Sequence, residues 1–237
     1  MVMTRISAFF IVLPIFSWRT IPVRIKISVV IFLSAFFTTI TSFPSFPKDI
    51  SPLYIILLLA NEAVYGLALG LIIAILFVVI KVAGRIIERQ MGLNMASVLD
   101  PMTGQKGQPL GTLLEIFFII IFLNVSGHHL FIMILSRSYE SLAIGDFSNT
   151  AVLTQSIIKA GSVMFIASLR LAAPILVCFI LLLVSLAVLA RISPEMNIFF
   201  ISLALRVGLG LLMVSTLLPF ISGYITEFSE WIYQIMP

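Results

Sequence analysis

Apolar residues in this chain gather into runs long enough to cross a membrane. An α-helix rises about 1.5 Å per residue, so about 20 apolar residues span the hydrocarbon core of a bilayer. Uncharged apolar runs of about this size occupy residues 27–47, 63–80, 116–136, 171–190 and 207–226. A further run, Ile6 to Ser17, reaches only about 18 Å and is too short to cross. The pattern predicts an all-α membrane protein of five to six long, partly kinked helices in hairpins.

Polar and charged residues indicate where these helices begin and how far they extend. Three runs continue upstream through one charged residue each, namely Glu62, Arg170 and Arg206. Ser51 followed by Pro52 is typical of an N-cap and a first helical residue. Thr112 and Glu115 have the spacing of a capping box, which predicts a helix start directly before residue 116.

A short polar break separates the last two apolar runs. Arg191 is suited to a helix C-terminus, where a cation is stabilised by the helix dipole. Ser193, Pro194 and Glu195 then provide the signals of a new helix start. Residues 191–195 are therefore predicted to form a tight turn, and the two flanking helices to form a hairpin.

The stretch between residues 81 and 111 departs from this pattern. Apolar residues recur at helical spacing up to Val98, so an amphipathic continuation of the helix is expected to end at Asp100, because Pro101 disfavours the α conformation of the residue before it. From Pro101 to Gly111 no regular structure is expected. One interpretation is an ordinary connector in water. The other is a re-entrant loop that lines or blocks a pore, since irregular backbone at membrane depth must be buried in protein or line water. The residues support both equally.

Composition and charge narrow the class of protein. Apolar residues make up 61% of the chain and charged residues 10%, which excludes an ordinary soluble domain. The net charge is +4, and the basic residues are scattered rather than clustered as nucleic-acid binding requires. Lys and Arg favour the loops at 18–26, 81–115 and 191–197, which are therefore predicted to be cytoplasmic. We expect one helical membrane domain over residues 1–237, with an internal flexible loop at 100–111.

The sequence provides little support for catalysis, metal binding or a cofactor. The two histidines, His128 and His129, are adjacent and point in different directions on a helix, and common catalytic motifs are absent. The interior charges Glu62, Arg170 and Arg206 are more informative, because an ionisable group in hydrocarbon normally faces a partner or a wet cavity. They indicate either a proton path or, as we favour, ion pairs between helices or subunits, with Glu62–Arg170 and Glu62–Arg206 as candidates.

Several segments together resemble one family. The stretch from Gly84 to Gly111, with QMGLNMASVLDPMTGQ at its centre, is similar to the signature of the FliR/SctT family of bacterial export-gate membrane proteins. The resemblance continues in SGHHLFIMILSRSYESLAIG at 126–145, RISPEMNIFFISLALRVGLGLL at 191–212 and RISAFFIVLPIFSWRTIPVRIKI at 5–27. Family members usually begin a dozen or more residues earlier. QMGLNMAS and SGHH favour the flagellar branch, whereas SVLDPMTGQKGQPLG is close to the loop of the injectisome branch.

The resemblance implies a function that the residues alone do not indicate. It implies a subunit of the flagellar type III export gate in the bacterial inner membrane and basal body, assembled with FliP-like, FliQ-like and FlhB-like subunits and passing unfolded export substrates. It also implies that the central loop plugs the resting pore. The plug residues are then Met95, Asp100, Pro101, Met102, Thr103, Gly104, Gln105, Lys106, Gly107, Gln108, Pro109 and Gly111.

Two alternatives of other classes remain open. A small secondary transporter would use Glu62 as its coupling carboxylate and would work alone or as a homo-oligomer. A passive scaffold would assemble other membrane subunits and would not depend on the loop.

Overall fold

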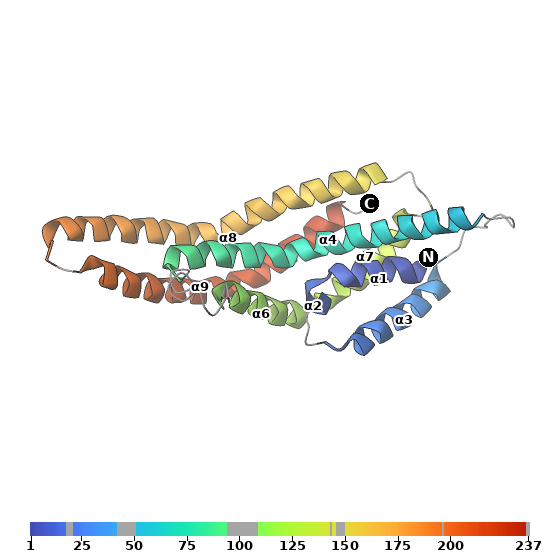
Figure 1. The fold of residues 1–237 in the computed structure, drawn as a ribbon, viewed down its shortest axis with the longest axis horizontal. Helices are drawn as coiled ribbons and strands as arrows, with labels where there is room; N and C mark the ends of the chain where they lie inside the picture. Colours follow the sequence, from blue (N-terminus) through green and yellow to red (C-terminus); the bar gives the residue numbers. More distant parts are fainter. Residues whose placement is uncertain are drawn as a thin grey trace. The chain divides into compact units, whose positions relative to one another are not determined.

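The computed structural model describes residues 1–17, 21–41, 51–93, 109–142, 144–145, 150–195 and 197–235, and these are almost entirely helical. The helices are α1 (Val2–Val12), α2 (Pro14–Ser17), α3 (Val23–Ile40), α4 (Pro52–Met91), α6 (Pro109–Asn124), α7 (His128–Ser141), α8 (Thr150–Ile192) and α9 (Ile198–Ile235). Four of them are long and apolar enough to cross a membrane, or five if the bent pair of α6 and α7 is one span. The prediction of an all-α membrane protein is confirmed (Figure 1).

The chain divides into two compact units. The first unit comprises residues 1–77, 126–162 and 227–237, and the second comprises residues 78–125 and 163–226. Within the first unit, α1 lies along α4, and the aromatic rings of Phe9 on α1 and Phe131 on α7 meet at 6.4 Å. Ile6 and Phe9 are fully buried, so the helix that is too short to span a membrane forms part of this unit's core.

Two glycines on α4 permit the close approach of α1. A Cβ atom added at Gly66 would collide with the carbonyl oxygen of Arg5, and one at Gly70 would lie 2.7 Å from the carbonyl oxygen of Phe9. Small residues four apart allow two helix backbones to pack this closely. Gly66 and Gly70 therefore form the surface of α4 against which α1 packs, whereas a Cβ atom at Gly208, which has the same spacing from Ala204, would have nothing within 4 Å.

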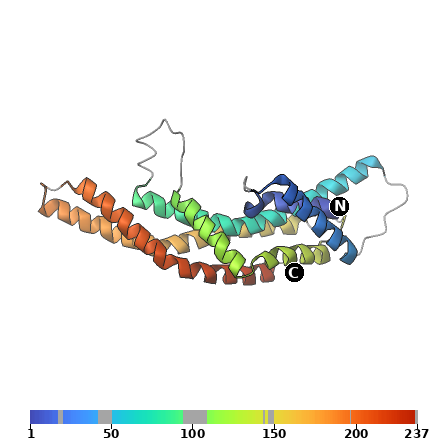
Figure 2. The ribbon, with the colours of Figure 1, turned by 90° about the horizontal axis from the view of Figure 1, so that it is seen from below.

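Within the second unit, α8 and α9 form the predicted hairpin, with the turn after Ile192 (Figure 2). The helix starting at Ser193–Pro194 is wrong, because α9 begins only at Ile198. The long helices α8 and α9 contain Pro174 and Pro219 respectively. The predicted N-cap of α4 is confirmed by a hydrogen bond of 3.3 Å that the Tyr54 amide donates to Ser51 Oγ.

The predicted single helix over residues 116–136 is wrong. The chain leaves the α conformation after Asn124, and α6 and α7 are bent by 72°. Ser126 adopts a positive φ of 61°, which a residue with a side chain rarely adopts and which interrupts the helical hydrogen bonds. A smaller difference concerns the run at 27–47, because α3 begins at Val23 and ends at Ile40.

The glycine contact gives a test of this packing. We expect Gly66→Ala to destabilise the chain by about 1–3 kcal/mol, because its Cβ must push α1 off α4. Gly161→Ala on α8 is the matched control, since nothing lies within 4 Å of that position and alanine favours a helix. Thermal unfolding of the purified chain in detergent measures both. Equal melting temperatures for the two variants would contradict the packing.

Candidate functional site

A fully buried ion pair connects α1 to α4 in the first unit. Arg5 Nε donates a hydrogen bond of 2.7 Å to Glu62 Oε2, and both side chains are 0% exposed. Burying two charges costs several kcal/mol per ion, so such a pair stabilises the fold only if its remaining polar atoms are also satisfied.

The remaining polar atoms of this pair do have partners. Arg5 Nη1 donates to the carbonyl oxygens of Ser138 and Leu142, each at 3.1 Å, and Nη2 donates to Leu142 at 3.2 Å. The backbone amide of Gly145 donates to Glu62 Oε1 at 3.1 Å. The Arg5 guanidinium also lies over the Tyr139 ring, 4.6 Å from its centroid. One side chain on α1 therefore binds α4, the end of α7 and the residue that follows it.

This arrangement gives Glu62 a partner that was not predicted. Within the first unit, Arg5 and Gly145 bind its two carboxylate oxygens. A pair of Glu62 with Arg170 or Arg206, which belong to the second unit, stays a prediction. Sequence reasoning missed Arg5, but it contained a usable signal. Glu62 lies four residues before Gly66 and therefore shares the helix face on which the glycines admit a neighbouring helix. The helix that packs on the glycines is the one that supplies the cation.

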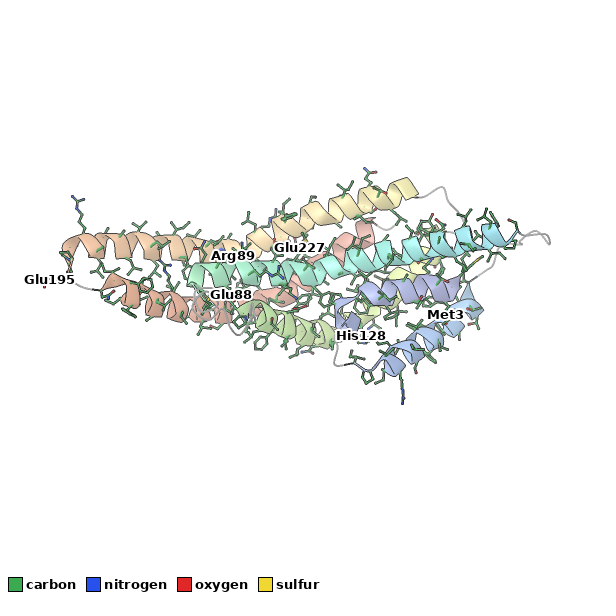
Figure 3. All side chains as sticks on the ribbon, in the orientation of Figure 1. Met3, Glu88, Arg89, His128, Glu195 and Glu227 are labelled. Atoms are coloured by element: carbon green, nitrogen blue, oxygen red, sulfur yellow. The ribbon has the colours of Figure 1, made fainter. Side chains whose placement is uncertain are left out.

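The other two interior arginines have different environments. Arg170 on α8 is exposed. Arg206 on α9 is half-buried, and its Nε atom is buried without a hydrogen-bond partner in the described part of the chain. The hairpin-turn residues Arg191, Pro194 and Glu195 are exposed, and Figure 3 shows Glu195 at the turn itself.

The second group of contacts lies where the central loop leaves α4 and enters α6. A Cβ atom at Gly84 would lie 2.9 Å from Gly111 Cα, so the two helix backbones nearly touch there. Lys81 Nζ and Glu115 Oε2 form an ion pair of 2.9 Å beside this crossing. The Gly111 amide donates a hydrogen bond of 3.4 Å to Glu88 Oε2, and Glu88 is 1% exposed. The two ends of the loop are thus held together by contacts from one face of α4.

These contacts correct three predictions about the loop region. The continuous helix α4 ends at Met91, where Gly92 adopts a φ of 77°, and not at Asp100. Helix α6 begins at Pro109, so residues 109–111 are helical rather than irregular. The capping box of Thr112 and Glu115 is wrong, because both residues lie inside α6.

Glu88 takes the role predicted for the capping box. It accepts a hydrogen bond from an amide in the first turn of α6, where amides have no partner within the helix. A carboxylate is also favoured at this end by the helix dipole. The predicted plug residues from Met95 to Gln108 lie outside the described residues.

Comparisons with known proteins identify the family. The sequence model of "Bacterial export proteins, family 1" matches residues 1–231. The chain belongs to this family. The flagellar biosynthetic protein FliR of Bacillus subtilis (strain 168) is 31% identical over 218 residues, covering 90% of this chain and 83% of the relative. FliR of Escherichia coli (strain K12) is 27% identical over 232 residues, covering 98% and 88%.

A protein-translocation protein is also related. The Yop proteins translocation protein T of Yersinia pestis is 27% identical over 220 residues, covering 90% of this chain and 83% of the relative. The predicted resemblance to the FliR/SctT family is therefore confirmed. With its apolar helices, this member of the bacterial export proteins is a multi-pass membrane component of the flagellar export apparatus.

The buried ion pair predicts strong coupling between its two residues. We expect Arg5→Met to destabilise the chain by about 3–5 kcal/mol, because Glu62 is left buried without its cation. Arg5→Met combined with Glu62→Met should recover much of this loss, since no charge then remains buried. A double-mutant cycle on the free energy of unfolding in detergent measures the coupling. Arg24→Met, at an exposed position of α3, is the control, and additive effects of the two changes would contradict the prediction.

The contact of Glu88 with α6 predicts a local effect. Glu88→Ala should cost about 1 kcal/mol and loosen the first turn of α6, because the Gly111 amide loses its acceptor. Glu88→Gln should behave nearly as the wild type, since its amide oxygen still accepts the bond. Hydrogen exchange measured by mass spectrometry should show faster exchange at residues 109–115 only in Glu88→Ala. Unchanged exchange in that variant would rule out the capping role.

Proposed function

We propose that this chain is the FliR-type subunit of a flagellar type III export gate in the bacterial inner membrane. The observation that carries the proposal is the family match over residues 1–231, together with FliR relatives that align over nearly the whole chain. The injectisome relative supports a related role on another export machine. The flagellar role is preferred because the relative of 31% identity is a flagellar protein.

The proposed partners are FliP-like, FliQ-like and FlhB-like subunits. Helix α8 supports a need for protein partners, because its exposed apolar side chains extend from Ile158 to Ile192, about 50 Å along the helix. The hydrocarbon core of a bilayer is only about 30 Å thick. Lipid alone therefore leaves part of this apolar face uncovered, and a subunit in an assembly would cover it.

We also propose that the segment Pro101–Gly111, which includes the start of α6, blocks the resting pore, and that unfolded export substrates displace it. The supporting observation is the geometry at the ends of the loop. Glu88 and Gly111 join the end of α4 to the start of α6, so the segment between them leaves and returns at one place.

The transporter hypothesis receives less support from the geometry of Glu62. Its carboxylate is 0% exposed and both oxygens accept hydrogen bonds from the chain's own residues. A coupling carboxylate must exchange a proton or an ion with water during transport, whereas this one is occupied by Arg5. The pair is therefore better explained as a structural contact.

Native mass spectrometry tests the proposal directly. The chain is tagged in its native host, purified in mild detergent and weighed as an intact particle. A large particle containing two further small hydrophobic proteins is expected, and the identity of these proteins separates a flagellar gate from an injectisome gate. A particle made only of this chain would overturn the proposal and favour the transporter.

Deleting residues 103–108 tests the loop. In a fully assembled gate, this deletion should let small ions leak across the membrane, because the resting pore loses its block. Lys106→Gln is the matched control, since it keeps the length of the loop and should not leak. Ion flux into proteoliposomes containing the assembled gate measures the effect. A deleted gate that assembles fully and stays tight would refute the blocking role and support a passive scaffold.

A further inference from the structure

Arg206 is a charged residue on an apolar helix without an ion-pair partner in the described chain. It lies in Ile198–Ile221, a candidate membrane span that is mostly not buried inside the chain. Its Nε atom is nevertheless buried and has no hydrogen-bond partner among the described residues. A guanidinium is permanently charged and has donors only, so it requires acceptors from some other group.

The position of Arg206 along α9 makes this requirement stronger. It lies eight residues after Ile198, about 12 Å along the helix, and about 22 Å before Ile221. It is therefore well inside the apolar segment rather than at an end. An unpaired charged side chain at such a position is costly in hydrocarbon.

The carboxylates of the second unit do not meet this requirement. Glu115 is paired with Lys81, and Glu88 binds the Gly111 amide. Glu195 is exposed in the hairpin turn (Figure 3), before the start of α9, and Arg206 lies about 12 Å along α9 from its first residue, Ile198. The described acidic residues of this unit therefore leave Arg206 without an ion pair.

The surface around Arg206 indicates the chemistry of the missing group. Two exposed apolar side chains share its face of α9, Phe199 seven residues and Leu203 three residues before it, and Leu205, Leu211 and Leu212 are exposed on neighbouring faces. A soluble acidic partner would leave this surface uncovered, and lipid tails would leave the guanidinium without an acceptor. An apolar helix that carries one carboxylate would cover the apolar surface and would also accept hydrogen bonds from the guanidinium.

We propose that Arg206 is the anchor of a docking surface on α9 for an apolar helix of another gate subunit, and that an Asp or Glu on this helix accepts hydrogen bonds from the guanidinium. The inference rests on the proposed function, because it requires an assembly of several subunits. It adds to that function the location and the charge of one contact. Burial of the pair between two apolar helices strengthens it, since the local dielectric constant is low.

Two other acceptors compete with this one. Glu88 Oε1 has no hydrogen-bond partner among the described residues, so a rearranged side chain within the second unit is one alternative. A lipid phosphate reached by the long Arg206 side chain is the other. With either of these acceptors, Arg206 would not contact another subunit. The two experiments that follow distinguish these acceptors from a carboxylate of another subunit.

Charge reversal is the first experiment. Arg206→Glu should reduce the yield of the assembled particle at least tenfold, because two carboxylates would then face each other, whereas Arg206→Lys should keep most of it. Arg89→Glu, an equal change of charge at an exposed position of α4, should assemble normally. Changes that restore the assembly of Arg206→Glu should replace an Asp or Glu by Lys or Arg in an apolar segment of another subunit. Restoring changes confined to this chain, or undiminished assembly of Arg206→Glu, would overturn the inference.

Photo-crosslinking covers the case in which the reversed variant fails to fold. A photoreactive residue at Phe199, seven residues before an intact Arg206 on the same face of α9, should crosslink to a peptide of another subunit with an acidic residue within about two helical turns of the crosslink. Crosslinks only to lipid or to this chain would overturn the docking surface. If the wild-type chain forms no multi-subunit particle, the proposed function itself fails. A normal wild-type particle without these crosslinks would reject the docking surface alone.

Discussion

The first unit depends on a charge that must never be left unpaired. Arg5 and Glu62 are both fully buried, and either one alone would carry a cost comparable to much of the stability of a small domain. The polar atoms of the pair are satisfied by one another and by separate parts of the chain, the end of α7 and Gly145. The close contact of α1 with Gly66 brings the arginine within reach. Packing and electrostatics therefore select the same arrangement of helices.

The long helices could be predicted from sequence because their signal is local and repeated. About twenty apolar residues in a row predict a helix long enough to cross a membrane, and α8 and α9 were predicted on this basis despite Arg170 and Arg206. The bend after Asn124 could not be predicted this way, since the residues on both sides remain apolar and a single positive φ at Ser126 breaks the helix. The start of α6 was also missed, because the acceptor for its Gly111 amide is Glu88, 23 residues earlier in the chain.

The candidate site also has features that the sequence predicts and features that depend on tertiary contacts. The apolar surroundings alone indicated that three charged residues required an explanation, namely Glu62, Arg170 and Arg206. Which groups pair depends on the tertiary approach of α1 to α4. The sequence around Arg5 does not indicate this contact, and the only signal is that Glu62 and Gly66 share one face of α4. The function of the central loop follows from family resemblance rather than from its composition, because glycine, proline and polar residues suit an ordinary connector equally well.

The bonds of Arg5 also determine when the first unit can be completed during synthesis. Its carbonyl acceptors, Ser138 and Leu142, are separated from it by 133 and 137 positions in the chain. At a typical elongation rate of about 5–20 residues per second, they emerge on the order of ten seconds after α1. In the later part of this interval, once Glu62 has been made 57 positions after Arg5, Arg5 can reach Glu62 but not the end of α7. The N-terminal helix therefore stays only partly bonded until a segment more than half the chain away has been made.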